Sequence, residues 1–201
     1  MRTHFSTCLF FFLTLTIGPL VFAEDMAKKQ GICLSCHSVN AQTAFPGPQL
    51  GGLSTSYINE QLLNFKTGLR NGGAAAEVMQ AAVQNLSEQQ LLALSGWASD
   101  LEKEQLFDDS KAKSSAGYQV YEAMCLGCHS SFMGRLMTSS PRLDGLSPEY
   151  IVRQITLFKA GKRTVATPSK HQTKMMFVID TLSDEELSSL NHFIEQSGPA
   201  L

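Results

Sequence analysis

The sequence contains few cysteines, and none is available for a structural disulfide in the mature chain. Of the five, Cys8 lies in an N-terminal segment that we expect to be removed, and the other four belong to two short motifs. This excludes a disulfide framework. The chain also lacks a strong net charge, which is −2 at pH 7, and has no basic stripe interleaved with aromatic residues. We therefore expect no nucleic-acid partner.

Long hydrophobic runs are also scarce. The one at the N-terminus, residues 9–17, follows Arg2 and is shorter than a membrane span requires. Val21-Phe22-Ala23 then supplies small residues for cleavage. We predict a signal peptide over residues 1–23 and export to the periplasm, with an uncleaved anchor as the alternative. We expect a soluble mature chain that can associate loosely with the membrane.

Two copies of one pentapeptide pattern stand out. They are Cys33-Leu34-Ser35-Cys36-His37 and Cys125-Leu126-Gly127-Cys128-His129. C-x-x-C-H is the attachment signature of c-type haem, in which two thiols bond one porphyrin and the histidine ligates iron from below. A zinc module fits poorly, because it needs further Cys or His pairs and is mostly intracellular. The sequence predicts two covalently bound haem c groups, with His37 and His129 as proximal iron ligands.

The residues after each motif repeat in register, so the chain is an internal duplication. Pro48 to Leu53 aligns with Pro141 to Leu146, and residues 86–91 align with 182–187. Single positions agree as well: Tyr57 with Tyr150, Gln61 with Gln154, Phe65 with Phe158, Gly68 with Gly161 and Arg70 with Arg163. Repeats of this length are tandem domains. We assign the first domain to residues 24–104, a polar linker to 105–115 and the second domain to 116–201.

Each copy reads as helices joined by loops, which predicts an all-α fold. Apolar residues have helical spacing over residues 57–66 and 150–159. Ser87 with Gln90, and Ser183 with Glu186, form the pattern of a capping box before an apolar run. Residues 117–124 read as a helix leading into the second motif, and we expect the equivalent lead-in of the first copy to be shorter.

Methionines at matching positions are candidates for the sixth iron ligand. Met79 and Met175 each lie seven residues before the repeated Leu-Ser pair. A thioether is a soft donor that stabilises ferrous iron. Met176 is the rival to Met175. His171 is a second alternative, which has no counterpart in the first repeat.

Other repeated residues are candidates for supporting roles. We expect the loops at Pro48 and Pro141 to place a backbone carbonyl beside the proximal histidine's second N–H. Gly52 and Gly145 would allow close approach of the chain to haem. We interpret Tyr57 and Tyr150 as packing residues, and Arg70 and Arg163 as candidate partners of the haem propionates.

The order C-x-x-C-H, P-x-L-x-G-L, distal Met, then L-S-[DE]-x-x-[LI] resembles class I cytochrome c domains. Two such domains in tandem behind a signal peptide are similar to the cytochrome c4 family of dihaem periplasmic electron carriers. The resemblance implies His/Met ligation of each haem, and two domains of a few helices each, related by approximate two-fold symmetry. It also implies that the propionate edges face one another.

Three functions are compatible with these features. The first is a non-enzymatic carrier of single electrons between respiratory-chain proteins, such as a quinol-oxidising complex and a terminal oxidase. The second is a dihaem subunit of a flavocytochrome c-type sulfide dehydrogenase. The third, a dihaem enzyme, would need an open sixth position or a distal cysteine. Five basic residues before Met175 would either steer an acidic redox partner or form a solvated loop: Lys159, Lys162, Arg163, Lys170 and Lys174.

Overall fold

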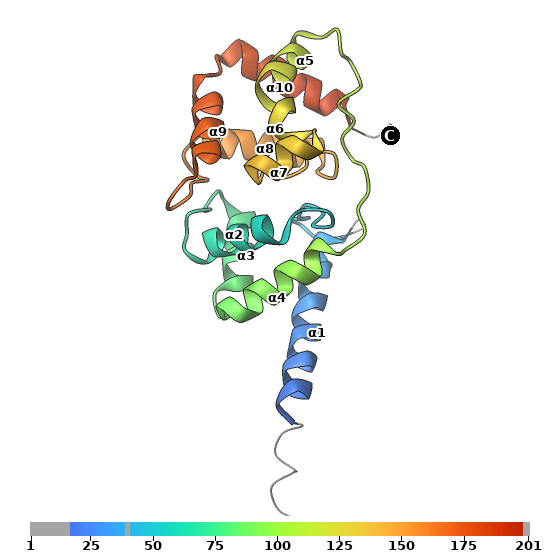
Figure 1. The fold of residues 1–201 in the computed structure, drawn as a ribbon, viewed down its shortest axis with the longest axis vertical. Helices are drawn as coiled ribbons and strands as arrows, with labels where there is room; N and C mark the ends of the chain where they lie inside the picture. The colour runs from blue at the N-terminus through green and yellow to red at the C-terminus, as the bar shows by residue number, and fades with distance from the viewer. Residues whose placement is uncertain (1–16, 39–40, 199–201) are drawn as a thin grey trace, which may run out of the picture.

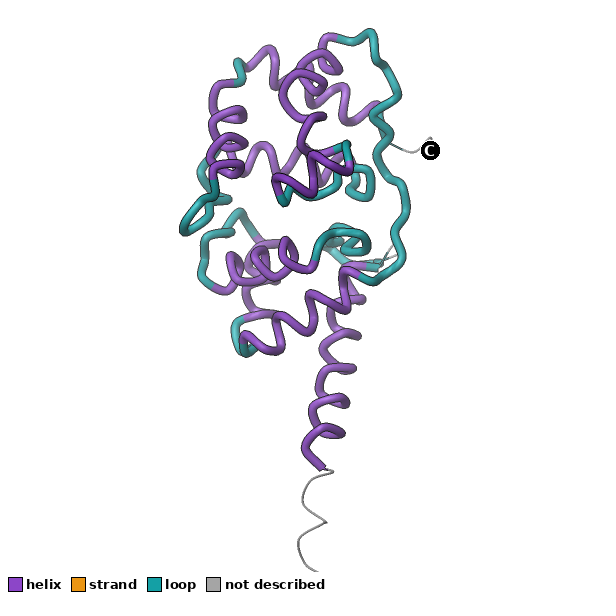
Figure 2. The backbone as a smooth tube through the Cα atoms, in the orientation of Figure 1, coloured by secondary structure: helices purple, strands orange, loops and turns teal. Residues whose placement is uncertain are grey.

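The computed structural model describes residues 17–38 and 41–198, which form two stacked helical bodies (Figure 1). Most of the predicted signal peptide lies outside the described residues. In the described part of the chain the elements are helices and loops (Figure 2). The first body comprises α1 (Ile17–His37), α2 (Thr55–Lys66), α3 (Ala74–Val83) and α4 (Glu88–Ser99).

The second body repeats this order with additions around its haem motif. Its elements are α5 (Ala116–Tyr121), the π-helix η1 (Glu122–Leu126), α6 (Gly127–His129), α7 (Phe132–Thr138), α8 (Pro148–Lys159), α9 (Lys170–Thr181) and α10 (Asp184–Gln196). This all-α arrangement confirms the predicted fold class. The π-helix and α7 were not anticipated from the sequence.

Serine side chains begin most of these helices. The predicted capping boxes are confirmed: Ser87 pairs with Gln90 at the start of α4, and Ser183 pairs with Glu186 at the start of α10. A third box, Ser169 with Gln172, begins α9. Each box satisfies backbone N–H groups that a helix leaves free at its first turn.

The second body has one continuous core, in which α5 crosses α10. Gly117 makes this crossing close, because a Cβ there would lie 2.0 Å from the carbonyl oxygen of Ser189. Aromatic rings fill the centre, including Tyr121, Phe193 and Phe107. Phe107 belongs to the segment predicted as a linker. This segment packs along the second body, because the backbone N–H groups of Leu106 and Phe107 both donate hydrogen bonds to the carbonyl of Asp144.

In the first body, the lead-in helix α1 packs less extensively on α4 than α5 packs on α10 in the second body. Glu24 and Ala116 each precede the first motif cysteine by nine residues, so the expectation of a shorter first lead-in is wrong. The difference lies in side chains, since Asp25 and Lys29 stand where the second copy has Gly117 and Tyr121. Among the described residues, no helix combines the length and hydropathy that crossing a membrane requires.

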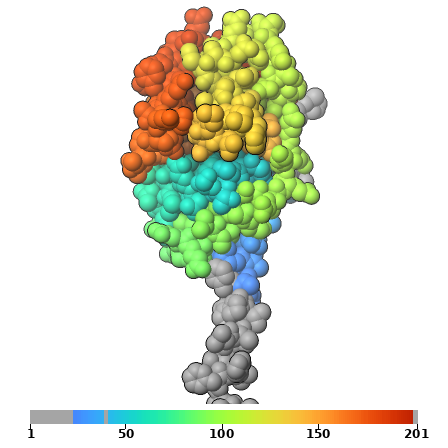
Figure 3. Space-filling view, in the orientation of Figure 1, coloured from blue at the N-terminus to red at the C-terminus, as the bar shows by residue number. Residues whose placement is uncertain are grey.

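The two bodies abut along a continuous surface (Figure 3). Two backbone hydrogen bonds join them: Asn71 N donates to the Lys162 carbonyl at 3.0 Å, and Thr164 N donates to the Leu69 carbonyl at 2.8 Å. Arg70 and Arg163 form an antiparallel bridge between these bonds. Matching positions of the two repeats thus meet at the interface, as an approximate two-fold axis requires.

Candidate haem sites

One cavity of about 370 Å³ gathers the first haem motif and its candidate distal ligand. Cys33, Cys36 and His37 line it from α1, and Met79 lines it from α3. Leucine, alanine, valine, isoleucine, phenylalanine and tryptophan side chains together form most of its remaining wall. A cysteine pair, an imidazole and a thioether around an apolar cavity form a donor set that suits haem c.

Each candidate proximal histidine is fixed by a backbone carbonyl. His37 Nδ1 donates to the Pro48 carbonyl at 2.7 Å, and His129 Nδ1 donates to that of Pro141 at 2.8 Å. The predicted role of the two proline loops is thus confirmed. The bond leaves Nε2 of each ring for iron and fixes the ring's orientation. Burial lowers the pKa of both imidazoles, with the proline carbonyls opposing that shift.

Gly47 is a supporting residue that the sequence reasoning missed. A Cβ at this position would lie 2.4 Å from the His37 ring, and Gly47 N donates to the Cys36 carbonyl at 2.8 Å. The loop therefore passes directly beside the imidazole because it has no side chain there. The sequence Pro46-Gly47-Pro48, beside the predicted contact of His37, could have indicated this role.

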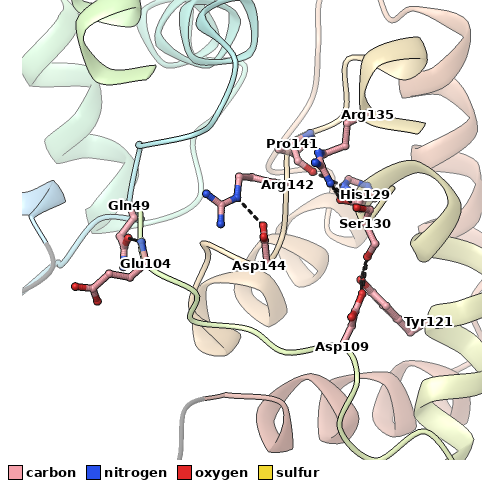
Figure 4. A network of polar contacts seen from close by, with 10 residues as sticks. All are labelled: Gln49, Glu104, Asp109, Tyr121, His129, Ser130, Arg135, Pro141, Arg142 and Asp144. Atoms are coloured by element: carbon pink, nitrogen blue, oxygen red, sulfur yellow. Dashed lines mark hydrogen bonds and ion pairs between the residues drawn. The ribbon is translucent and has the colours of Figure 1, made fainter. Parts of the chain in front are cut away.

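The second haem motif is tied to the segment that joins the two bodies (Figure 4). Ser130, directly after His129, donates its hydroxyl to Asp109 Oδ2 at 2.6 Å, and Tyr121 donates to the same oxygen at 3.2 Å. Burial, followed by the Asp109 charge, raises the pKa of Tyr121, so it remains a donor at neutral pH. Burial also raises the pKa of the Cys125 thiol to about 12.

The candidate distal ligands lie on matching helices. Met79 is four residues before buried Val83 in α3, and Met175 is four before buried Ile179 in α9. Met176 corresponds to Gln80, whose side-chain amide donates to the Arg70 carbonyl at 3.2 Å. His171 lies one turn before Met175 on the same helix.

Two buried arginines and two glutamines form a symmetric network between the bodies. The carboxamide oxygen of Gln154 accepts from Arg70 at 2.8 Å and from Arg163 at 3.0 Å. The oxygen of Gln61 accepts from the same two arginines, at 3.1 and 3.0 Å. Each glutamine therefore bridges both guanidinium groups.

Two tyrosines complete this network. Arg70 donates to the Tyr150 hydroxyl at 3.0 Å, and Arg163 donates to that of Tyr57 at 2.9 Å. The interpretation of these tyrosines as packing residues therefore missed their contact across the interface. Burial alone would raise the pKa of Tyr150, but the two arginines lower it. The sequence could have indicated a shared role for these residues, since a tyrosine and a glutamine recur one helical turn apart in both repeats.

No ion pair in the described residues includes Arg70 or Arg163. Both guanidinium groups are buried, and both line the cavity that contains His37 and Met79. Buried charge without an opposite charge is costly. The cavity thus offers two cations to an anionic group that enters it.

The expected basic cluster before Met175 is divided by the fold. Arg163 is buried between the bodies, and the Lys159 ammonium donates to the Leu182 carbonyl at 2.5 Å. Lys162, Lys170 and Lys174 are exposed. Three of the five charges are therefore exposed, while Lys159 is partly buried and Arg163 is buried.

The glycines of the two P-x-L-x-G-L loops lie close to Arg142, whose side chain points toward Asp144 (Figure 4). Gly52 has a φ of +75°, and a Cβ there would lie 2.6 Å from Arg142 Nη1. A Cβ at Gly145 would lie 3.1 Å from the same guanidinium. Arg142 Nε donates to Asp144 at 2.5 Å. Both glycines make room for an arginine in this structure. That they also allow close approach to haem stays a prediction.

Known proteins share both the sequence pattern and this fold. The sequence model of the cytochrome c family matches residues 114–198. Cytochrome c4 of Azotobacter vinelandii is 27% identical, over 91% of this chain and 94% of its own. Cytochrome c-554(548) of Halomonas halodenitrificans is 32% identical over 42% of this chain and 99% of its own. The crystal structure of reduced cytochrome c4 from Pseudomonas stutzeri superposes with a TM-score of 0.61 and 26% identity, covering 86% of this chain and 97% of the other.

Proposed function

The chain belongs to the cytochrome c4 family of dihaem electron carriers, and on that premise we propose that it carries single electrons between respiratory-chain proteins in the periplasm. The donor we propose is a quinol-oxidising complex, and the acceptor is a terminal oxidase. One observation carries this proposal: a single cavity gathers Cys33, Cys36, His37 and Met79 and extends to Arg70 and Arg163. The family is that of an electron carrier and not of an enzyme.

We assign one covalent haem to each domain. Cys33 and Cys36 would bond the first haem, and Cys125 and Cys128 the second. His37 and His129 would be the proximal ligands, which is supported by their matching bonds to Pro48 and Pro141. When bound, each haem supplies reversible exchange of one electron. The protein's part is to orient the imidazole and to surround the group with apolar side chains.

For the distal ligands we propose Met79 and Met175. The helical register supports Met175 over Met176, because the position of Met176 corresponds to Gln80, which bonds the Arg70 carbonyl. Ligation by methionine raises the reduction potential relative to two imidazoles. Filling the sixth position also leaves no place for a substrate on iron, as expected of a carrier.

For Arg70 and Arg163 we retain the proposed role as propionate partners. The two guanidinium groups are buried and border the cavity that contains His37 and Met79. Among the described residues, their hydrogen-bond partners are neutral oxygens. Propionate carboxylates are the negative charges that a haem would bring there. This assignment would give the buried cations a counter-charge without a buried Asp or Glu.

The domain limits and export remain part of the proposal. We place the first domain at residues 24–104 and the second at 116–201, with residues 105–115 between them. Bonds from this segment to the second body, such as Asp108 N to the Ser197 carbonyl at 2.8 Å, support a linker fixed to one side. Removal of residues 1–23 would leave Glu24 as the first residue of α1.

A permanent dehydrogenase subunit is the alternative, but one feature favours the mobile carrier. The clearest exposed apolar group in the described part of the second body is on the seven-residue helix α7. Obligate interfaces bury on the order of 2,000 Å² or more, which is far beyond one such helix. A small apolar surface suits a transient contact.

Gel filtration of native periplasmic extract, followed by haem absorbance, tests this proposal. The expected haem peak elutes alone at the mass of one small protein, with two covalent haems per chain by pyridine haemochrome assay and mass spectrometry. Haem that elutes together with a larger flavin-containing chain would instead identify a dehydrogenase subunit. A cytoplasmic fraction holding the haem would contradict the localisation.

A further inference from the structure

Helix α7 exposes all of its large apolar side chains. Phe132 is 70% exposed, Met133 58%, Leu136 64% and Met137 72%. We call these four residues the α7 patch. Clustered exposure of this kind on a soluble protein marks an interaction surface more often than an isolated exposed leucine does.

Two side chains of the α7 patch, those of Phe132 and Leu136, point away from the haem motif. The opposite side of the helix is held against that motif by Gly134, where a Cβ would lie 2.0 Å from the Gly127 carbonyl oxygen. Phe132 and Leu136 are each two residues from Gly134, so they lie on the far side of the helix. A haem attached through Cys125 and Cys128 would therefore leave these two side chains exposed.

The α7 patch also lacks free charge. Arg135 is the one charged residue of α7, and its guanidinium turns back to donate to the carbonyls of Ser130, at 2.5 Å, and His129, at 3.3 Å. These bonds tie the helix to the end of the haem motif. The surface that remains is apolar and uncharged, and complements a partner surface of the same kind.

The first domain does not repeat this feature. The corresponding stretch after His37 is loop in its described residues, 38 and 41–46. In the space-filling view, α7 lies on the front of the second body, above the first (Figure 3). The two domains therefore present different surfaces beside their haem motifs.

We propose that the α7 patch is the surface through which the second domain contacts a redox protein whose own contact face is apolar and uncharged. This inference rests on the proposed carrier function. With a haem attached through Cys125 and Cys128, one electron would pass from its ferrous iron to the partner's metal centre, which is reduced as the haem iron becomes ferric. Methionine and phenylalanine suit such a contact because they adapt to varied surfaces. Attachment of α7 to Gly127 keeps the contact close to the covalently held haem.

Opposite charges placed at one position test the proposal. Leu136→Lys and Leu136→Glu are compared as reduced holoproteins, with a blue copper protein whose copper edge is ringed by apolar side chains as acceptor. Both variants should lower the second-order rate constant by about tenfold, because each buries a charge in an apolar contact. The wild-type rate should change little with salt, since the contact contains no charge pair.

The same changes on another exposed leucine provide the control. Leu92 lies on α4 of the first body and is 57% exposed, so Leu92→Lys and Leu92→Glu should react at the wild-type rate. Binding is followed separately by NMR, in which the amide signals of residues 131–138 should shift on addition of the copper protein. They should shift less in both Leu136 variants.

Several results would overturn the proposal. Unchanged rates in both Leu136 variants would do so, as would opposite effects of lysine and glutamate, which indicate an electrostatic contact. Wild-type self-association in sedimentation, or binding to phosphatidylethanolamine–phosphatidylglycerol vesicles, that both Leu136 variants lose would assign the α7 patch to a second copy or to the membrane. Oxidation by ferricyanide distinguishes a failure of the α7 patch proposal from a failure of the proposed carrier function. A wild-type protein that does not reduce ferricyanide would count against the carrier function itself.

Discussion

Arg70 and Arg163 meet backbone to backbone across the domain interface, and each guanidinium reaches the tyrosine of the other domain. The two side chains carry like charges, and burial lowers the pKa of Arg70. What holds them together is a set of shared acceptors, above all the carboxamide oxygens of Gln61 and Gln154. The interface thus depends on neutral groups that bridge two cations.

Replacing Gln154 with leucine should destabilise the protein. Gln154→Leu removes an acceptor from both Arg70 and Arg163 at a buried position. Leaving their N–H groups unpaired should lower the free energy of unfolding by about 2 kcal/mol. Urea unfolding of the holoprotein measures this loss. Gln89→Leu makes the same chemical change at an exposed position of α4 and should have an effect near zero; equal effects would show that the network contributes nothing.

Replacing Met79 with alanine should alter one haem and leave it attached. The loss of a thioether ligand should lower that haem's reduction potential by on the order of 0.1 V, within the roughly 0.8 V that axial ligands span. The open position should bind carbon monoxide, which a difference spectrum detects. Met175→Ala should do the same at the second haem, and Met176→Ala should not. Carbon monoxide binding at the wild-type level would disprove the assignment of Met79.

Gly52 should not tolerate a side chain. Its φ of +75° opposes alanine, and so does the distance of 2.6 Å that would separate an added Cβ from Arg142 Nη1. Gly52→Ala should therefore cost about 1–3 kcal/mol in thermal or urea unfolding. In an Arg142→Ala background the part of this cost that comes from Arg142 should disappear, while the contact with Lys103 Cδ, 2.8 Å from the added Cβ, remains. The control is Gly96→Ala in α4, where a Cβ meets nothing within 4 Å. That change should stabilise the helix by roughly 0.5–1 kcal/mol.

Acid should weaken the second domain through one capping residue. Hydrogen bonds from Ser183 lower the pKa of Glu186 below its ordinary 4.5. A depressed folded-state pKa gives stability that is present above pH 4.5 and lost as the pH falls through the folded value. Glu186→Gln should therefore flatten the acid limb of the stability curve. Gln90, at the same position of the first domain, already has a side chain that does not titrate.

Local features of this fold could be predicted from the sequence because they depend on neighbouring residues. The two capping boxes and the bonds from His37 and His129 to the proline loops involve short separations, of 3 to 12 residues. The repeat register carried these assignments from one domain to the other. Pattern and spacing suffice when the partners are close in the chain.

Contacts between the domains could not be predicted in this way. Tyr57 meets Arg163 across 106 residues and Tyr150 meets Arg70 across 80. Which faces of two similar domains meet is decided by the complementarity of whole surfaces, and no short pattern records it. For the same reason, the sequence groups Arg163 with nearby lysines although the fold buries it. Helix α7 was missed because its apolar residues follow no buried face.

The position of Arg142 beside Gly52 has a consequence for how the two halves of the molecule can change. In a symmetric pair of identical chains, each arginine would be matched by a second one, and both would have to fit at once. Here the corresponding residue is Gln49, which instead accepts the backbone N–H of Glu104 at 3.0 Å. Joining two copies in one chain freed each half to vary without altering its counterpart, so a single molecule can present two unlike surfaces.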